Sequence, residues 1–517
     1  MDNRFSGFVS VFHARSLPEP QASLAGYAAL IETYKLQVPL PEQCAAISLH
    51  HKRYATTEWT IYTPRHKPKD SLAGHLTFAL KYEGIDLAVL KSLFNAIDSQ
   101  EIADWVRSEP TSRYSRRVWF LYEWLMQKKL PVADAINGNF FDVLDETLQY
   151  PGASELSQRH RIRNNLPGTP DFCPLIRRTA TLEKYINLHL DVVAHKKIKA
   201  MRPDLLNRAS AFLLLQDSQA SFTIEHETPP SARIERWGTA LGQAGKQPLT
   251  LEELLRLQAI VLEGSRFIEL GFRREGGFIG THNRVTGSPQ PDHISARWDN
   301  LDQLLDGFFA TYNRLKASPL NPVLQASLLA FGFVFIHPFI DGNGRIHRYL
   351  IQQILAECEF IPFSIVLPIS AVILENIDAY RQVLEQYSHP RLAFIQWKED
   401  AHKNIVVLNE TIDLYRYFDA TKQAEFLFKC VDYAIRQSLP QEIIYLQQHD
   451  LMKEALKKDF GMTDNQSSLM IHFLSQNNGL LSKRVKNKEF SALSTDECLR
   501  IEKLYVAIFV IETAEQE

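Results

Sequence analysis

The sequence of 517 residues predicts a mainly α-helical protein. Apolar residues recur at spacings of three and four rather than in alternation, for example over residues 76–94 and 114–126, as they do on one face of a helix. The composition is that of a folded globular protein, with 45% apolar and 23% charged residues. At roughly 100 to 200 residues per domain, this length favours about three domains, each able to bury its own core.

Turn-rich stretches divide the chain into these domains. Gly, Pro, Asn and Asp cluster at residues 164–174, which indicates the main boundary and ends a helical N-terminal domain over residues 1–165. A central domain is expected over residues 181–405, followed by a small helical or winged-helix-like domain over residues 420–517. Residues 272–296 of the central domain are rich in Gly and β-formers, which predicts a hairpin-like excursion. Such an excursion from a helical domain is usually functional.

Charge and cysteine content argue against several classes of function. The net charge is −3, with 57 Lys and Arg against 60 Asp and Glu, so no global attraction draws the chain to nucleic acid or an anionic membrane. The five cysteines are scattered without a CxxC pair, which argues against a zinc ribbon or a disulfide framework. The first residues lack a leader or lipidation pattern, and no stretch reaches about 18 apolar residues. We therefore expect a cytoplasmic protein with no membrane partner.

The segment FVFIHPFIDGNGRIHRYL, residues 333–350, carries the chemistry. Its two glycines let the backbone approach a ligand closely, and the helix that follows presents unpaired N–H groups to an anion. Arg345 and Arg348 lie three apart on one side of that helix, within reach of one polyphosphate. Asp341 is placed to hold Mg²⁺ beside the phosphates. A neutral His337 can accept a proton from an incoming hydroxyl.

This segment resembles the signature loop HPFx[D/E]GNGRxxR of the Fic (Fido) family, which it matches at every fixed position. The resemblance covers roughly residues 181–405 and implies a Fic-type helical core with a short β-hairpin flap. It implies an enzyme, a protein adenylyltransferase that transfers AMP from Mg·ATP to a Ser, Thr or Tyr hydroxyl of a target protein. His337 would be the catalytic base and Asp341 would hold the metal. The implied nucleotide-binding residues are Gly342, Asn343, Gly344, Arg345 for the β-phosphate, Arg348 for the γ-phosphate, and Tyr380 against the adenine.

A second resemblance lies upstream of the loop. Residues from Ser221 to Glu225 resemble the family's inhibitory motif [S/T]xxxE[G/N], with His226 in place of Gly or Asn. The resemblance implies that Glu225 pairs with Arg348 and autoinhibits the enzyme, because a carboxylate and a phosphate oxygen compete for the same guanidinium. Glu83 is a rival for this role, although its match lacks the Ser or Thr. We prefer Glu225.

The predicted hairpin and the C-terminal module concern partners. Phe278, Ile279 and Gly280 are expected in the family's flap, which holds a target segment by strand addition. The alternatives on the same loop are removal of AMP or transfer of another phosphate-linked group. A different alternative is a nucleotide-sensing regulator whose basic residues around 483–488 contact DNA as a wing. The target protein, homodimerisation and self-modification stay open at this point.

Overall fold

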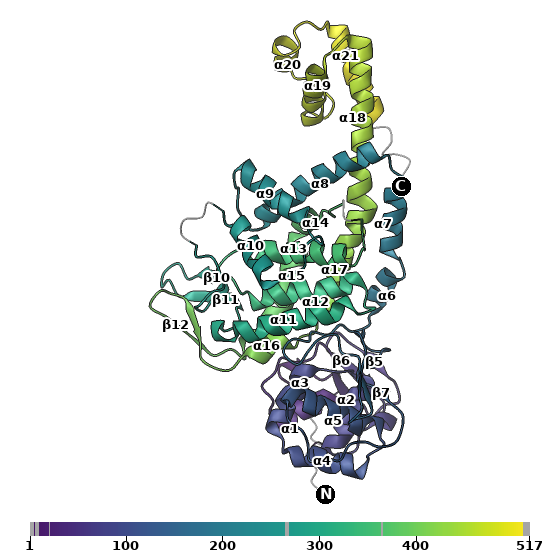
Figure 1. The fold of residues 1–517 in the computed structure, drawn as a ribbon, viewed down its shortest axis with the longest axis vertical. Helices are drawn as coiled ribbons and strands as arrows, with labels where there is room; N and C mark the ends of the chain where they lie inside the picture. Colours follow the sequence, from purple (N-terminus) through teal and green to yellow (C-terminus); the bar gives the residue numbers. More distant parts are fainter. Residues whose placement is uncertain (1–4, 6–9, 20, 264–267, 363–364, 510–517) are drawn as a thin grey trace.

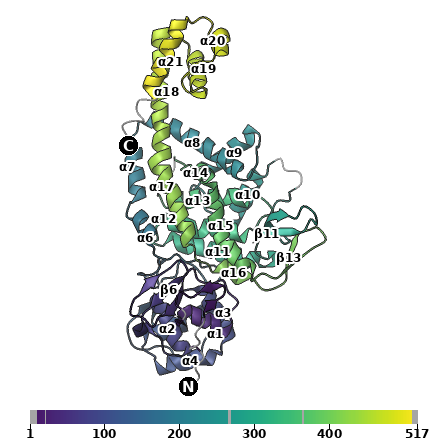
Figure 2. The same ribbon diagram turned by 180° about the vertical axis from the view of Figure 1, so that it is seen from behind.

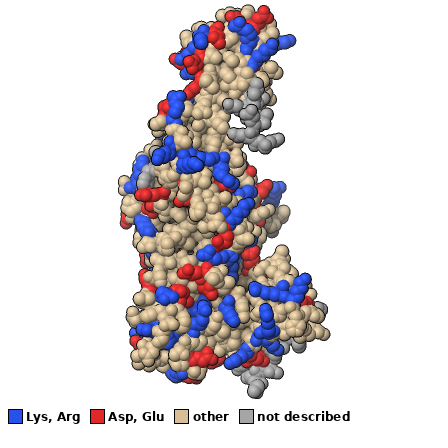
Figure 3. Space-filling view, turned by 90° about the vertical axis from the view of Figure 1, so that its right-hand side faces the viewer, with Lys and Arg blue, Asp and Glu red and all other residues tan. Residues whose placement is uncertain are grey.

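The computed structural model describes residues 5, 10–19, 21–263, 268–362 and 365–509. Helices dominate it, which confirms the mainly α prediction (Figure 1). Buried apolar side chains form three large clusters, one in the N-terminal part, one in the central part and one near the C-terminus. These three parts follow one another along the long axis (Figure 1). The view from behind shows the same order (Figure 2). On the face shown in Figure 3, basic and acidic side chains are interspersed, in keeping with the net charge of −3.

The N-terminal part combines helices with small sheets. The prediction of a helical region was therefore incomplete, because strands of two to four residues are too short to show an alternating pattern. The larger sheet has the order β3-β4-β6-β5, with β4 parallel to β6, and the smaller one has the order β7-β9-β8. The elements are β1 (Val11–Phe12), β2 (Arg15–Ser16), β3 (Ser23–Ala25), α1 (Gly26–Tyr34), β4 (Cys44–Ile47), β5 (Tyr54–Ala55), β6 (Trp59–Tyr62), α2 (Leu72–Tyr82), α3 (Leu87–Ala96), α4 (Ser99–Ser108), α5 (Arg113–Met126), β7 (Phe141–Asp142), β8 (Glu155–Ser157) and β9 (Ile162–Asn164).

The central part is a helical bundle built around α12. Every residue of α12 from Val323 to Ile336 is buried, because the helix is apolar on all sides and is covered all round. A short loop joins α12 to α13, which packs against it. The helices of this part are α6 (Ala180–Ile186), α7 (Leu190–Lys199), α8 (Pro203–Ile224), α9 (Ser231–Leu241), α10 (Leu251–Val261), α11 (Leu301–Lys316), α12 (Pro322–Ile336), α13 (Asn343–Glu357), α14 (Ile369–Glu375), α15 (Ile377–Leu392), α16 (Ile412–Arg416) and α17 (Thr421–Tyr433).

The hairpin predicted over residues 272–296 is present. It consists of β10 (Phe278–His282) and β11 (Pro289–Ile294), which pair antiparallel with an irregularity between Ile279 and Gly280. A second hairpin, β12 (Trp397–Glu399) and β13 (Ile405–Val407), braces the first, since Asn404 Nδ2 donates to the carbonyl of Gly276 at 2.8 Å. Both hairpins project from the same side of the bundle (Figure 1).

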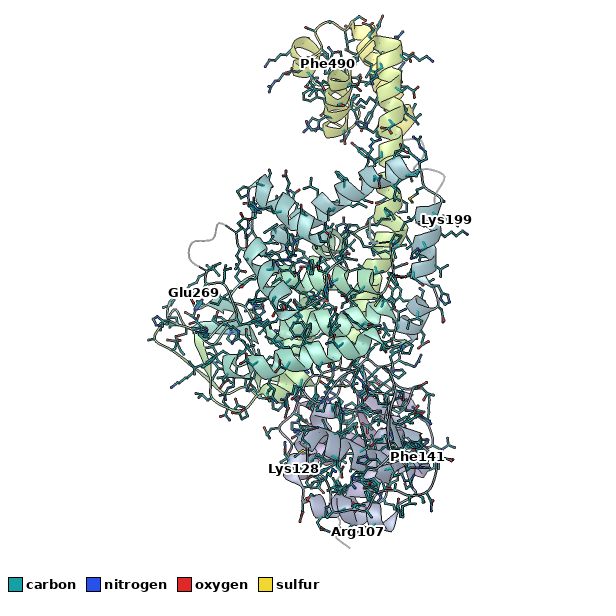
Figure 4. The ribbon with its side chains drawn as sticks, viewed as in Figure 1. Arg107, Lys128, Phe141, Lys199, Glu269 and Phe490 are labelled. Carbon is teal, nitrogen blue, oxygen red and sulfur yellow. The ribbon has the colours of Figure 1, made fainter. Side chains whose placement is uncertain are left out.

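The C-terminal part stands at the end of a long helix. Helix α17 belongs to the central core and continues through a π-helical turn, Ala434–Ser438, into α18 (Leu439–Phe460). Helices α19 (Asp464–Gln476), α20 (Lys483–Lys488) and α21 (Thr495–Phe509) then pack on the far end of α18, around side chains that include Phe490 (Figure 4). Within residues 420–509 the elements are all helical, so the helical alternative holds. The basic segment expected as a wing is α20, because Ser482 Oγ accepts from Val485 N and starts a helix.

Helix α8 lies beside this long helix and links it to the central part. Arg208 on α8 pairs with Asp450 on α18 at 2.7 Å. In the part of the chain that the structure describes, no helix has the length and apolar character needed to cross a membrane.

Candidate active site

His337 ends α12 in the left-handed region, with φ 55° and ψ 61°. Its Nδ1 lies 3.2 Å from the carbonyl oxygen of Val334, which can only accept, so Nδ1 carries the proton and Nε2 keeps its lone pair. Burial, together with the nearby charge of Arg273, lowers the pKa of His337 to about 4. The imidazole is therefore neutral near pH 7, which is the state that a general base requires.

Arg273 holds the loop that carries His337. It is 3% exposed, and its Nε donates to the carbonyl of His337 at 2.8 Å, while its backbone N–H donates to Pro338 O at 3.0 Å. Its remaining nitrogens donate to the carbonyls of Glu275 and Ala296, on either side of the hairpin. Burial lowers the pKa of Arg273 to about 10. The sequence alone does not predict this role, since an arginine in a Gly-rich excursion gives no local sign of burial.

Asn343 braces the loop from within. It is 1% exposed, its Oδ1 accepts from Phe339 N at 3.0 Å, and its Nδ2 donates to Phe339 O at 2.8 Å. Phe339 is fully buried and stacks on Phe272 with ring centroids 4.9 Å apart. The side-chain amide of Asn343 is thus engaged with the backbone of Phe339. The backbone N–H of Asn343, at the start of α13, remains available to bind an anion. Gly342, with φ 95°, makes the turn into α13 that a side chain would strain.

Arg348 has the partner that the sequence predicted. Its Nη2 lies 2.8 Å from Glu225 Oε1, and its Nε donates to Ser221 Oγ at 3.0 Å. The absence of a side chain at Gly344 makes room for this pair, because a Cβ there would lie 2.0 Å from Glu225 Oε1. The rival Glu83 lies in the N-terminal part, where it accepts from a backbone N–H, and burial raises its pKa to about 8.

Arg345 also has carboxylate partners, one of which the sequence does not predict. Its Nη2 lies 2.9 Å from Asp341 Oδ1, and its Nη1 lies 2.5 Å from Oε1 of Glu227. Glu227 is two residues beyond Glu225, and this closeness in sequence is the only feature that could have predicted the contact with Arg345. The side chains of Arg345 and Arg348 are each 1% exposed, so both guanidinium groups are buried.

Two guanidinium nitrogens at the site have no hydrogen-bond partner among the residues that the structure describes. These are Nε of Arg345 and Nη1 of Arg348, both buried. Buried N–H groups are nearly always bonded, so these two donors beside the start of α13 suit the oxygens of a bound anion. Among the described residues, no group of three or more His, Cys, Asp and Glu could hold a metal. Asp341, whose side chain is 37% exposed, fits Mg²⁺ that takes its other ligands from phosphates and water.

The remaining predicted residues lie in two places. Tyr380 is 4% exposed in the core, with its ring 6.0 Å from that of His347, and burial raises its pKa to about 12. Its ring therefore offers little free surface to an adenine. Phe278, Ile279 and Gly280 lie on β10, where Ile279 is 44% exposed. The hairpin adjoins His337, since the ring of His293 on β11 is 6.3 Å from that of His337.

Known protein families and curated proteins are similar to the part of the chain that contains this loop. A family model described as Fic/DOC family matches residues 248–355, which contain the loop and both arginines. Two proteins named "Protein adenylyltransferase Fic", from Drosophila ananassae and Drosophila grimshawi, are 34% and 35% identical to the chain over 121 residues, which is 23% of this chain and 22% and 23% of theirs. The chain thus matches less than a quarter of the length of these curated relatives.

Solved structures of Fic proteins also align with the chain. A Fic family protein from Desulfovibrio desulfuricans has a TM-score of 0.38 and 19% identity, over 54% of this chain and 80% of its own. A Fic domain containing signaling protein from Bacteroides thetaiotaomicron has a TM-score of 0.34 and 17% identity, over 51% of this chain and 97% of its own. With the family match at residues 248–355 and the signature loop inside it, the chain contains a Fic/DOC-family domain.

Proposed function

We propose that this chain is a protein adenylyltransferase that moves AMP from Mg·ATP to a hydroxyl group of a target protein, and that Glu225 holds the reaction back. One observation carries the proposal. A neutral histidine with a free Nε2 stands at one end of the loop, and two buried arginines with unpartnered N–H groups stand at the other. A base for a hydroxyl and a binding site for phosphates are the two parts that AMP transfer needs.

The residues divide the reaction between them. His337 Nε2 takes the proton of the target hydroxyl, whose oxygen attacks the α-phosphorus of ATP. The bond from the α-phosphorus to the bridging oxygen breaks, and pyrophosphate leaves with that electron pair. Arg345 and the N–H groups at the start of α13 stabilise the charge on the leaving group. Asp341 would hold Mg²⁺, which supplies further neutralisation of the phosphates when bound.

The hairpin is suited to holding the target. Within the described part of the chain, β10 pairs only with β11, so the other edge of β10 has free backbone groups. An extended target segment can add to such an edge through main-chain hydrogen bonds. We propose that Phe278, Ile279 and Gly280 present this edge, which would bring a target hydroxyl near His337.

Glu225 acts as the brake by occupying Arg348. Its carboxylate accepts a hydrogen bond from Nη2 of Arg348 at 2.8 Å. Ser221 Oγ accepts from Nε of the same arginine, and the carbonyl of Ser221 accepts from Nη2, also at 2.8 Å. A γ-phosphate needs the same guanidinium, so the carboxylate and the phosphate exclude each other. Glu225 is itself 34% exposed, so it can turn away into water.

The test is labelling of protein with α-labelled ATP and Mg²⁺. We expect little label with the wild type, strong label with Glu225→Ala, and none with Glu225→Ala/His337→Ala. Glu235→Ala removes an exposed carboxylate from α9 and should behave as the wild type. γ-labelled ATP should leave no label, because the γ-phosphate departs in pyrophosphate. Absence of label in every variant that still binds ATP would contradict the proposal.

A further inference from the structure

The turn that carries Glu225 carries a second carboxylate, Glu227, on the other signature arginine. Glu227 Oε1 lies 2.5 Å from Nη1 of Arg345, and Glu225 Oε1 lies 2.8 Å from Nη2 of Arg348. We propose that Glu227 is a second inhibitory group, which closes the β-phosphate position at Arg345 while Glu225 closes the γ-phosphate position at Arg348. The inference rests on the proposed function for the assignment of the two phosphates.

The backbone explains how one turn reaches two arginines. Helix α8 ends at Ile224, and His226 follows in the left-handed region with φ 58°. The turn is fixed by His226 N donating to Thr223 O at 2.9 Å and Glu227 N donating to Phe222 O at 3.1 Å. Left-handed residues of this kind reverse the chain at helix ends. The residues on either side of His226 thus both face α13, where the two arginines lie three residues apart.

Burial decides which partner must move when a nucleotide enters. The side chain of Arg345 is 1% exposed, whereas that of Glu227 is 30% exposed. The arginine is therefore fixed, and the glutamate has access to water. Glu227 and Asp341 already occupy Nη1 and Nη2 of Arg345. A phosphate oxygen that accepts a hydrogen bond from Nη1 or Nη2 of this guanidinium must therefore displace one of these carboxylates.

Glu227 also forms an ion pair with a second arginine, Arg233. Glu227 Oε2 lies 2.9 Å from Nη1 of Arg233, whose Nε donates to the carbonyl of Val261 at 2.8 Å. Both arginines of this trio lie against the ring of Phe222, with guanidinium carbons 5.0 Å and 5.2 Å from its centroid. Giving up Arg345 thus leaves Glu227 paired with Arg233, so the carboxylate never becomes an unpaired charge. That makes the exchange with phosphate feasible.

Nucleotides of increasing length separate the two carboxylates. We would measure the dissociation constants of AMP, ADP and ATP with Mg²⁺ by calorimetry for the wild type, Glu225→Ala, Glu227→Ala and the double variant. ADP has a β-phosphate and no γ-phosphate, so its affinity should rise about tenfold in Glu227→Ala and stay unchanged in Glu225→Ala. ATP affinity should rise in both, and most in the double variant. AMP affinity should be the same throughout, and Glu235→Ala should match the wild type with all three.

Each other outcome has a definite meaning. Equal ADP affinity in the wild type and Glu227→Ala would mean that the Glu227–Arg345 contact is only a structural ion pair, and would overturn the inference. In that case, a gain in ATP affinity in Glu225→Ala would still support the proposed function. A parallel gain for AMP would indicate general loosening and would also overturn it. Absence of ATP binding in all variants would remove the proposed function itself. If thermal melting shows that Glu227→Ala is not folded, Glu227→Gln, which keeps the size and removes the charge, takes its place and should raise ADP affinity by a smaller factor.

Discussion

The two ends of the signature loop are held by different kinds of contact. At the base end, the contacts of His337 and Arg273 are to backbone carbonyl oxygens, and they do not involve the groups that a nucleotide would use. At the phosphate end, Arg345 and Arg348 are held by the carboxylates of Asp341, Glu225 and Glu227. Under the proposed function, this difference means that the base is in place before any nucleotide binds, whereas the proposed phosphate site exchanges its partners. Regulation at one end can therefore leave the chemistry at the other end intact.

The largest effect should come from removing the base. In the Glu225→Ala/Glu227→Ala background, we expect His337→Ala to lower the rate of AMP transfer by about 10² to 10⁴, the usual share of general base catalysis. ATP affinity should not change, because His337 lies at the other end of the loop from the arginines. Single-turnover labelling and calorimetry measure the two quantities. A matching loss of ATP affinity would mean that the two ends are not independent.

The next effect tests whether Arg273 positions the base. Arg273→Met removes the donors to the carbonyls of His337, Glu275 and Ala296 and keeps much of the side-chain volume. In the Glu225→Ala/Glu227→Ala background, called the brake-free variant below, we expect kcat to fall about ten- to hundredfold with KM for ATP little changed. Misplacement of a catalytic group such as His337 by about 1 Å has this cost. Arg274→Met is the control, because Arg274 is exposed beside it. A rise in KM alone would assign Arg273 to nucleotide binding.

A smaller effect concerns pH. The base works in its unprotonated form, and burial lowers the pKa of His337 to about 4. Transfer by the brake-free variant should therefore be nearly constant from about pH 8 to about pH 6 and should decline only toward pH 4, as the imidazole becomes protonated. The pH profile of kcat measures this. A midpoint near the ordinary value of about 6.5 would mean that His337 is not shielded when substrates are bound.

Much of the site could be predicted from the sequence because it lies in continuous motifs. The loop from His337 to Arg348 is one segment, and the pairing of Arg348 with Glu225 is implied by the resemblance of residues 221–226 to the family's inhibitory motif. What could not be predicted depends on packing. Nothing in the sequence indicates that a turn would aim Glu227 at Arg345.

The same limit applies to the fold and to the other residues of the site. The apolar α12 and the Gly-rich hairpin are visible in the sequence as local patterns. Arg273 bonds to carbonyls of segments more than twenty residues away, which no local pattern encodes. Tyr380 was expected at the adenine, and its burial among aromatic rings follows from the docking of α17 on the bundle. Two-residue strands in the N-terminal part are likewise fixed by their partners rather than by their own sequence.

The smallest effect tests whether the turn at His226 serves both carboxylates at once. A residue other than glycine in the left-handed region costs about 1 kcal/mol, and the exposed side chain of His226 gives little packing in return. His226→Gly should therefore stabilise the turn by up to about 1 kcal/mol, less the entropy that glycine adds to the unfolded chain. Because the turn aims both Glu225 and Glu227, affinities for ADP and ATP should fall together by a few-fold, while AMP affinity stays the same. His226→Val, which is strained in this region, should shift both affinities the opposite way. A change in ATP affinity alone would mean that the turn positions Glu225 and that Glu227 is held by Arg233.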